Sequence, residues 1–154
     1  MKTIEDLANQ FREVHLSGKW VVLTNLKEQL SNVTWQQATT KIGSLNTIAL
    51  LAYHINYYVS GMLNVLQGGT LDIKDKYSFN APPITSEQDW NGLLNKMWSD
   101  AETFANVLER MPDEKMQQPF ADEKYGSYQK NIDALIGHIY YHLGQIVLIK
   151  KLMD

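Results

Sequence analysis

Apolar residues recur at alternating steps of three and four along four long segments of the chain, and each segment is predicted to be a helix. The predicted helices span about 3–30, 47–67, 85–111 and 130–153. The stretch 42–71, which contains the second helix, has no charged residue, but polar residues interrupt its apolar runs. We therefore interpret it as a helix buried in a soluble protein and not as a membrane span.

Several residues indicate where these helices begin and end. Asn46 is a plausible N-cap of the second helix, and Thr85 and Gln88 have the spacing of a capping box at the start of the third. Pro112 ends the third helix. Gly18 is the weak point of the first helix, where it costs about 1 kcal/mol relative to alanine.

Four such helices predict an all-α protein, and a four-helix bundle is the leading fold. We expect one domain over 1–154. The connections, about 31–45, 68–84 and 112–129, are long for a simple up-down bundle, so they allow crossovers or loops that wall a site. The four tryptophans are interpreted as packing anchors: Trp20, Trp35, Trp90 and Trp98.

Composition narrows the chemistry that the chain can perform. Its 154 residues include no cysteine, which excludes disulfides, cysteine metal sites, iron–sulfur clusters and a cysteine nucleophile. A net charge of −3 argues against a nucleic-acid partner. The N-terminus becomes acidic at once and does not resemble a secretory signal, so we expect a cytoplasmic protein with no membrane partner. The remaining reactive groups are four histidines, the carboxylates and the hydroxyls.

Three of the histidines have positions that suit a metal site. His138 and His142 are four residues apart, which puts them on one face of the fourth helix, about 40° and about 6 Å apart. His142 occupies a step of the apolar seam, and His54 borders the core face of the second helix. If these helices are neighbours, the three imidazoles can form a site with an open position, as in catalytic zinc centres. Spacing alone leaves open that they are core histidines with ordinary hydrogen-bond partners.

Other residues near this pattern carry weaker signals. Ile139 occupies the place of the general base in a His-Glu-x-x-His metalloprotease motif, which argues against a peptidase. Gln145 can orient a ligand or a bound water, or serve helix packing. Tyr58 is a possible neighbour of the site, although aromatic residues at this spacing are more often part of the core. His15 is a possible fourth ligand or neighbour, and a half-exposed histidine is the simpler interpretation.

The sequence His138-Ile-Tyr-Tyr-His142-Leu-Gly-Gln145 resembles the last-helix signature of the DinB-like superfamily, His-x-x-Tyr-His-x-Gly-Gln, and 50–55 resembles the segment that supplies its first histidine. The resemblance implies a four-helix bundle of up-down-down-up topology. It also implies a divalent metal, such as nickel or zinc, on His54, His138 and His142. Many members are dimers, and some are thiol-dependent S-transferases or isomerases that use bacillithiol, mycothiol or glutathione.

Our leading hypothesis is therefore a metal-dependent S-transferase, in which a low-molecular-weight thiol is the cosubstrate and a small electrophile is the substrate. We expect it to act in a stress response and to form a homodimer. Because the chain has no cysteine, the sulfur has to come from the cosubstrate. The alternatives are a metal-dependent hydrolase, a non-catalytic bundle that binds a metal or a ligand in a stress-related role, and a metal-free helical interaction protein.

Overall fold

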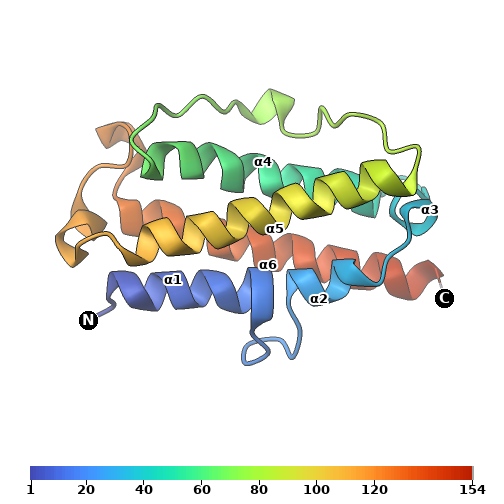
Figure 1. The fold of residues 1–154 in the computed structure, drawn as a ribbon, viewed down its shortest axis with the longest axis horizontal. Helices are drawn as coiled ribbons and strands as arrows, with labels where there is room; N and C mark the ends of the chain where they lie inside the picture. The colour runs from blue at the N-terminus through green and yellow to red at the C-terminus, as the bar shows by residue number, and fades with distance from the viewer. Residues whose placement is uncertain (154) are drawn as a thin grey trace.

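The computed structural model describes residues 1–153, which form an all-helical four-helix bundle (Figure 1). In chain order the α-helices are α1 (Ile4–Arg12), α2 (Leu26–Ser31), α3 (Trp35–Ala38), α4 (Ile48–Leu66), α5 (Glu87–Glu109) and α6 (Tyr128–Met153). A π-helical turn, Glu13–Ser17, continues α1, and 3-10 turns lie at Asp75–Tyr77, Asp113–Gln117 and Glu123–Tyr125. In the described part of the chain, β-pairing is limited to one isolated bridge between Pro119 and Ser127.

The prediction of one continuous first helix was wrong, because the helix ends at Ser17. The Glu13 carboxylate accepts hydrogen bonds from the backbone N–H groups of Trp20 (2.5 Å) and Val21 (3.2 Å), and this holds the chain in a loop. That carboxylate fills the space beside Gly18, where an added Cβ would lie 1.6 Å from Glu13 Oε2. Gly18 therefore permits a close approach of the Glu13 side chain that no other residue allows. The next helix, α2, begins only after the N-cap Asn25.

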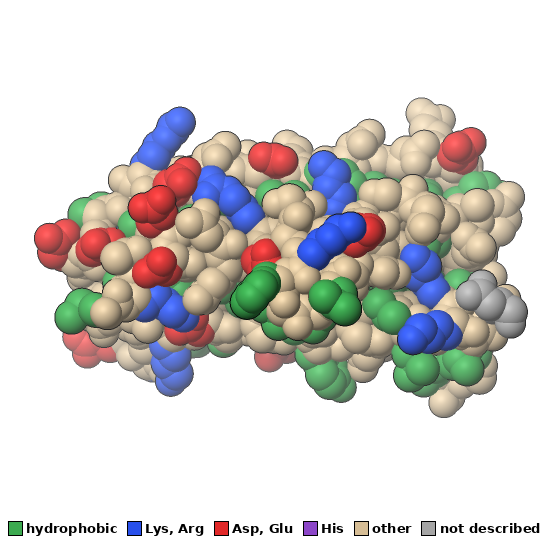
Figure 2. Space-filling view, turned by 90° about the horizontal axis from the view of Figure 1, so that it is seen from below, with side chains coloured by type: hydrophobic (Ala, Val, Ile, Leu, Met, Phe, Trp, Pro, Cys, Tyr) green, Lys and Arg blue, Asp and Glu red, His purple; other side chains and the backbone are tan. Residues whose placement is uncertain are grey.

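The loop after Gly18 exposes its apolar side chains. Trp20 is 91% exposed and Leu23 is 82% exposed, so the prediction that Trp20 anchors packing was wrong. The loop projects from the face shown in Figure 2, where several hydrophobic side chains lie at the surface. Further exposed apolar side chains lie on α6, namely Tyr141, Leu148 and Leu152.

Two helix ends differ from the predicted caps. Thr47, one residue after the predicted Asn46, caps α4 by accepting from the N–H of Leu50 (3.2 Å). At α5 the N-cap is Ser86, which accepts from the N–H of Asp89.

The predicted capping box of Thr85 and Gln88 was therefore also wrong by one position. The carboxylate of Asp89 accepts from both the N–H and the hydroxyl of Thr85 (3.0 and 3.1 Å). An ionised carboxylate is a stronger acceptor than a glutamine amide, so Asp89 decides the register of this helix start.

The core lies where the long helices meet. The rings of Phe11 on α1 and Phe104 on α5 are 4.4 Å apart between centroids, and both side chains are fully buried. Trp90 is buried as predicted, and its Nε1–H donates to the carbonyl oxygen of Val33 (2.8 Å). This bond ties α5 to the short connection before α3, so the polar group of a buried tryptophan is satisfied.

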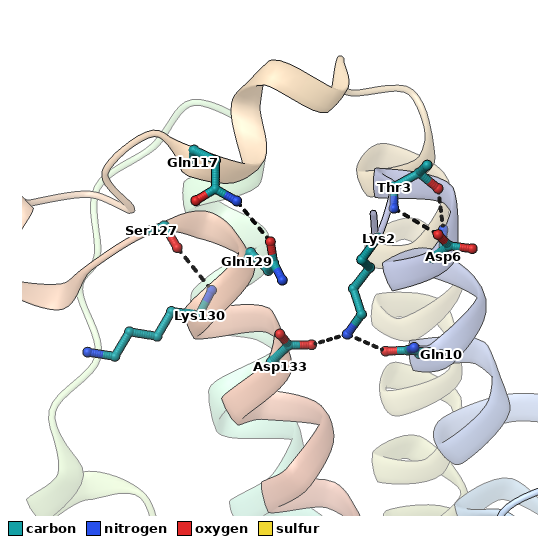
Figure 3. Close-up of polar contacts among 9 residues, drawn as sticks. All are labelled: Lys2, Thr3, Asp6, Gln10, Gln117, Ser127, Gln129, Lys130 and Asp133. Carbon is teal, nitrogen blue, oxygen red and sulfur yellow. Dashed lines mark hydrogen bonds and ion pairs between the residues drawn. The ribbon is translucent and has the colours of Figure 1, made fainter.

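Polar contacts join the chain's first residues to the start of α6 (Figure 3). The ammonium of Lys2 donates to Gln10 (3.0 Å) and pairs with Asp133 (2.8 Å). Close by, the amide of Gln117 donates to Gln129 (2.9 Å) and so holds the preceding connection against α6. The first turns of α6, which lead to the histidines, are thus held from two sides.

By length and composition, α6 is the helix among residues 1–153 that would be able to cross a membrane. Of its most apolar 18-residue window, 44% is buried inside the bundle. A core helix of a bundle satisfies the same criteria, so this is weak evidence for a span.

The connection after α4 runs back along that helix before α5 begins (Figure 1). The hydroxyl of Tyr57 donates to the carbonyl of Lys74 (3.0 Å) and accepts from its N–H (2.8 Å). The hydroxyl of Tyr58 donates to Asp75 (2.7 Å). These bonds fasten the connection to α4, and the residues that follow reach His54.

Candidate metal centre

Three histidines converge between α4 and α6. The Nε2 atom of His138 lies 3.0 Å from Nε2 of His54 and 3.0 Å from Nε2 of His142. One ring nitrogen from each of the three lies within 4.8 Å of the others. His54 and His142 are 7% exposed, and His138 is half-buried. The condition set from the sequence, that these two helices are neighbours, is met, and their packing brings the three imidazoles into one cluster that can hold a metal ion.

Gln145 sets the tautomer of one of these histidines. Its Oε1 lies 2.7 Å from Nδ1 of His142, and an amide oxygen only accepts hydrogen bonds. Nδ1 of His142 is therefore the donor in this contact, which leaves Nε2 as the ring nitrogen directed at the cluster. The orienting role suggested for Gln145 agrees with this contact, since a histidine that binds metal usually donates its other N–H in this way.

Burial favours the neutral form of the other two rings. Burial, and then the neighbouring His142 and His54, lower the pKa of His138 to about 4. Burial also lowers the pKa of His54, with His142 acting in the same direction. Neutral imidazoles near pH 7 have the lone pairs that a metal requires.

The donor set fits a divalent metal. Four-coordinate zinc has Zn–N distances of about 2.0–2.1 Å, which places ligand nitrogens about 3.3–3.4 Å apart. The two Nε2–Nε2 distances of 3.0 Å are close to this spacing. Nε2 of His138 faces two other Nε2 atoms, and one ring nitrogen carries either one proton or one lone pair, so it does not satisfy both neighbours. A shared cation would satisfy the converging nitrogens.

Residues from the connection after α4 cover this cluster. The ring of Phe79 stacks on His54, with centroids 4.0 Å apart and planes 4° apart. The ring of Tyr58 contacts His54 and His138 edge-on, at 5.2 and 5.0 Å. Burial, and then the bond to Asp75, raise the pKa of Tyr58, so its hydroxyl keeps the proton that it donates. Tyr58 thus lies beside the site, as suggested from the sequence.

Sequence reasoning missed Phe79 and Asp75. Both lie in an irregular connection, where no helical period marks them. The one signal was the aromatic content of 74–83, which indicated a folded segment but not what it contacts.

A cavity of about 590 Å³ opens beside the cluster. His54, Tyr58 and His138 form one side of it. The other walls combine apolar and polar side chains from α4, α6 and two connections: Met62, Leu71, Ile73, Lys74, Asp75, Phe120, Tyr125, Asn131, Ala134 and Leu135. A cavity of this size and mixed lining suits a small molecule with an apolar body.

His15 does not join the other three histidines. It is 0% exposed, so the half-exposed interpretation was wrong. Its ring packs between Phe11 (5.2 Å between centroids) and Trp98 (5.7 Å), and neither ring nitrogen has a hydrogen-bond partner among residues 1–153. The structure therefore offers no contact through which His15 would act on the cluster, either as a fourth ligand or as a neighbour of one.

We expect His15 to make the fold sensitive to acid. Burial lowers its pKa to about 4, against the opposing charge of Asp100, whereas a histidine in the unfolded chain titrates near 6.5. Between these values the unfolded chain binds the extra proton, so the free energy of unfolding decreases as the pH falls from 6.5 to 4. The loss is at most about 3 kcal/mol. Urea denaturation of wild type and His15→Leu at pH 7 and pH 4.5 measures it.

The leucine variant should lose less stability than wild type over the same pH interval, because it keeps an apolar side chain in an apolar site. Equal losses in the two proteins would assign the acid sensitivity to other groups.

A family model described as the DinB superfamily matches residues 3–146 of the chain. The match includes α1 to α5 and most of α6, with all three clustered histidines. No curated protein matches the chain, and no solved structure does.

Proposed function

The chain belongs to the DinB superfamily, and from this premise we propose that it is a metal-dependent S-transferase that uses a low-molecular-weight thiol. Family membership and the three-histidine cluster fit a metal-dependent protein. The observation that carries the proposal is the convergence of three imidazoles beside a cavity large enough for a small substrate. His54, His138 and His142 are the proposed ligands of a divalent metal, nickel or zinc.

Each residue has a part in the proposed reaction. When bound, the metal lowers the pKa of a cosubstrate thiol and so raises the fraction of reactive thiolate. Gln145 holds His142 in the tautomer that binds, and Phe79 shields His54 from water. The sulfur attacks an electrophilic carbon in the cavity, the C–S bond forms, and the leaving group departs with its bonding electrons while the thiol proton goes to solvent. The chain itself supplies no thiol, since it has no cysteine.

Turnover with defined thiols tests the proposal. The zinc- or nickel-loaded protein is incubated with bacillithiol, mycothiol or glutathione and a chromogenic electrophile, and thioether formation is followed. We expect a rate above that of His142→Ala with at least one thiol. If wild-type protein that holds metal is no faster than His142→Ala with any of the three thiols, the transferase proposal is contradicted. Thiol-independent cleavage of an ester panel would instead support the hydrolase alternative.

Replacing Gln145 tests the second layer of the site. Gln145→Leu removes the acceptor that holds the Nδ1 proton of His142. Loss of a hydrogen-bond partner of a metal ligand reduces metal affinity about 10–100-fold. Competition with a chromogenic chelator measures the affinity. Gln145→Glu, which keeps an acceptor, is the matched control and should stay closer to wild type. A leucine variant with unchanged affinity would show that this contact serves packing alone.

The proposal includes the up-down-down-up order that the resemblance implies. In Figure 1 the colours support it, because α4 and α5 both run away from the side where the C-terminus lies, and α1 and α6 run toward it. The long connection after α4 supplies the crossover that two such consecutive helices need. A cytoplasmic location stays a prediction.

We also propose a homodimer formed through the face shown in Figure 2. The exposed apolar loop, Trp20–Leu23, leaves from a turn that contacts α6, and α6 itself exposes Tyr141, Leu148 and Leu152. Apolar side chains gathered on one face favour contact with a second copy, and a two-fold interface uses the same face of both chains.

Light scattering after size exclusion tests the dimer. Wild type should show twice the 17.7 kDa of one chain. The variant Trp20→Ser/Leu23→Ser should shift the mass toward that of one chain. A wild-type monomer at all concentrations, or a dimer unaffected by this variant, would contradict the proposed interface.

A further inference from the structure

The connection after α4 lies against that helix at several successive turns (Figure 1). Ile73 packs on Gly61 so closely that no room for a Cβ remains at the glycine. The next residue, Lys74, bonds to Tyr57, which lies one turn earlier on α4. These contacts fix the place from which the connection approaches the metal centre.

The hydroxyl of Tyr57 makes two hydrogen bonds to the same residue. It donates to the carbonyl oxygen of Lys74 (3.0 Å) and accepts from the N–H of Lys74 (2.8 Å). A hydroxyl has one donor and two acceptor lone pairs, so both bonds can form at once. Two bonds fix both the position and the direction of the backbone at Lys74, which a single bond would not do.

Residues 74–79, the covering segment, are joined by local hydrogen bonds. The N–H of Tyr77 donates to the carbonyl oxygen of Lys74 (2.9 Å). The N–H and the hydroxyl of Ser78 donate to the carbonyl oxygen of Asp75 (3.0 and 2.8 Å), and Ser78 is buried. These bonds make one compact turn, so the position of the last residue of the segment depends on that of the first.

His54 and His142 are oriented in different ways. Gln145, on the same helix as His142, bonds to Nδ1 of that histidine (2.7 Å). Nδ1 of His54 is buried, and in the described part of the chain it has no partner with hydrogen-bond geometry. The groups that lie on His54 instead are the parallel ring of Phe79 and the backbone of Ser78, which acts against the lowering of the His54 pKa by burial. Both belong to the covering segment.

The stacked ring of Phe79 restrains His54. The two rings are 4.0 Å apart between centroids and 4° from parallel. Rotation of the imidazole about its bond to Cβ would turn its edge into the Phe79 ring, so the stack fixes the plane of His54. A metal ligand usually depends on a neighbour of this kind for its orientation.

We propose that Tyr57 is a positioning residue of the metal centre, which acts on His54 through the covering segment. Its two bonds to Lys74 place the segment, and the segment holds the Phe79 ring against His54 so that Nε2 stays directed at the cluster. The proposal rests on the proposed metal-dependent function and extends it to a residue outside the histidine cluster.

Zinc affinity tests the proposal, with Tyr57→Phe as the variant and Tyr53→Phe as the matched control. Tyr53 lies one turn earlier on α4, and its hydroxyl has no hydrogen-bond partner within residues 1–153. Competition with a chromogenic chelator should give Tyr57→Phe a dissociation constant for zinc about threefold or more above that of wild type, because two hydrogen bonds that place the segment are lost. Tyr53→Phe should match wild type. Equal affinities of Tyr57→Phe and wild type would overturn the proposal.

A second variant tests the route of the effect. Phe79→Leu removes the stacked ring but keeps an apolar side chain, and we expect it to weaken zinc binding about fivefold or more. If Tyr57 acts through Phe79, the double variant Tyr57→Phe/Phe79→Leu should bind zinc nearly as well as Phe79→Leu alone, within about 1.5-fold. Effects that multiply in full in the double variant would overturn the proposal, since they would show that the two residues act independently.

Hydrogen exchange of the zinc-free chain separates this inference from the metal centre. In Tyr57→Phe the amide of Ser78 should exchange about threefold or more faster than in wild type, because its turn has lost its attachment to α4. The amide of Leu143, buried on α6, should keep its rate. An unchanged rate at Ser78, or equal acceleration at both amides, would overturn the proposal.

The two kinds of failure are distinguishable. A wild-type chain that holds no zinc would contradict the proposed function before any variant is compared. Unchanged exchange at Ser78 in Tyr57→Phe would contradict the positioning role whether or not zinc binds.

Discussion

Replacing His142 with alanine is expected to reduce the zinc or nickel held by the untagged chain from about one ion to less than about 0.2 per chain after desalting. The variant loses the nitrogen that lies 3.0 Å from Nε2 of His138, and with it the one ring whose tautomer Gln145 holds. Two imidazoles on different helices remain, and these bind a divalent ion too weakly to survive desalting. Elemental analysis measures the content, with circular dichroism to verify the fold.

The matched control is His15→Leu, because His15 is also a buried histidine but lies outside the cluster. It should retain the wild-type metal content. If His142→Ala retains as much metal as wild type, or if His15→Leu loses as much as His142→Ala, the three-histidine assignment is wrong. The readout does not depend on any activity, so it tests the site separately from the transferase proposal.

Replacing Phe104 with alanine is expected to lower the free energy of unfolding by about 3–5 kcal/mol, a large share of the 5–15 kcal/mol typical of a domain. The ring is fully buried and packs on Phe11 across the contact between α5 and α1. Its loss removes apolar burial and leaves a cavity that these rigid helices cannot close. Urea denaturation at pH 7 measures the change.

Phe79→Ala is the control, since it removes the same atoms from a side chain that is 40% exposed. Phe79→Ala should lower the free energy of unfolding by less than about half as much as Phe104→Ala, because much of the Phe79 ring already contacts water. Equal losses would contradict the position of the core. The Phe79 ring covers His54, so Phe79→Ala should also expose that histidine. The metal content of this variant is therefore informative as well.

The sequence predicted the bundle well where a helix buries one face over many turns. The periodic segments that became α4, α5 and α6 were located to within a few residues, because repeated apolar steps leave no other way to bury them. Helix starts were less predictable. Thr47 and Ser86 cap helices where Asn46 and Thr85 were expected, since neighbouring polar residues have similar capping preference and local hydrogen bonds decide between them.

The first helix shows a different limit. Val21 has the right spacing for a buried face, yet the loop that begins at Gly18 turns it outward. The deciding contact is between Glu13 and the backbone of Trp20, a bond that exists only once the helix has ended. Periodicity cannot distinguish this arrangement from a continuous helix.

The sequence by itself determined which residues can form the metal centre. Without cysteine the candidate ligands are histidines, and the four-residue step from His138 to His142 places two of them on one helix face in any fold that keeps the helix. Only the tertiary structure decided that His54 meets them and that His15 does not, because this depends on which helices pack together. The same packing laid Phe79 over His54. Such contacts join residues far apart in the chain, and their distances follow from the packing of whole helices, which no local spacing encodes.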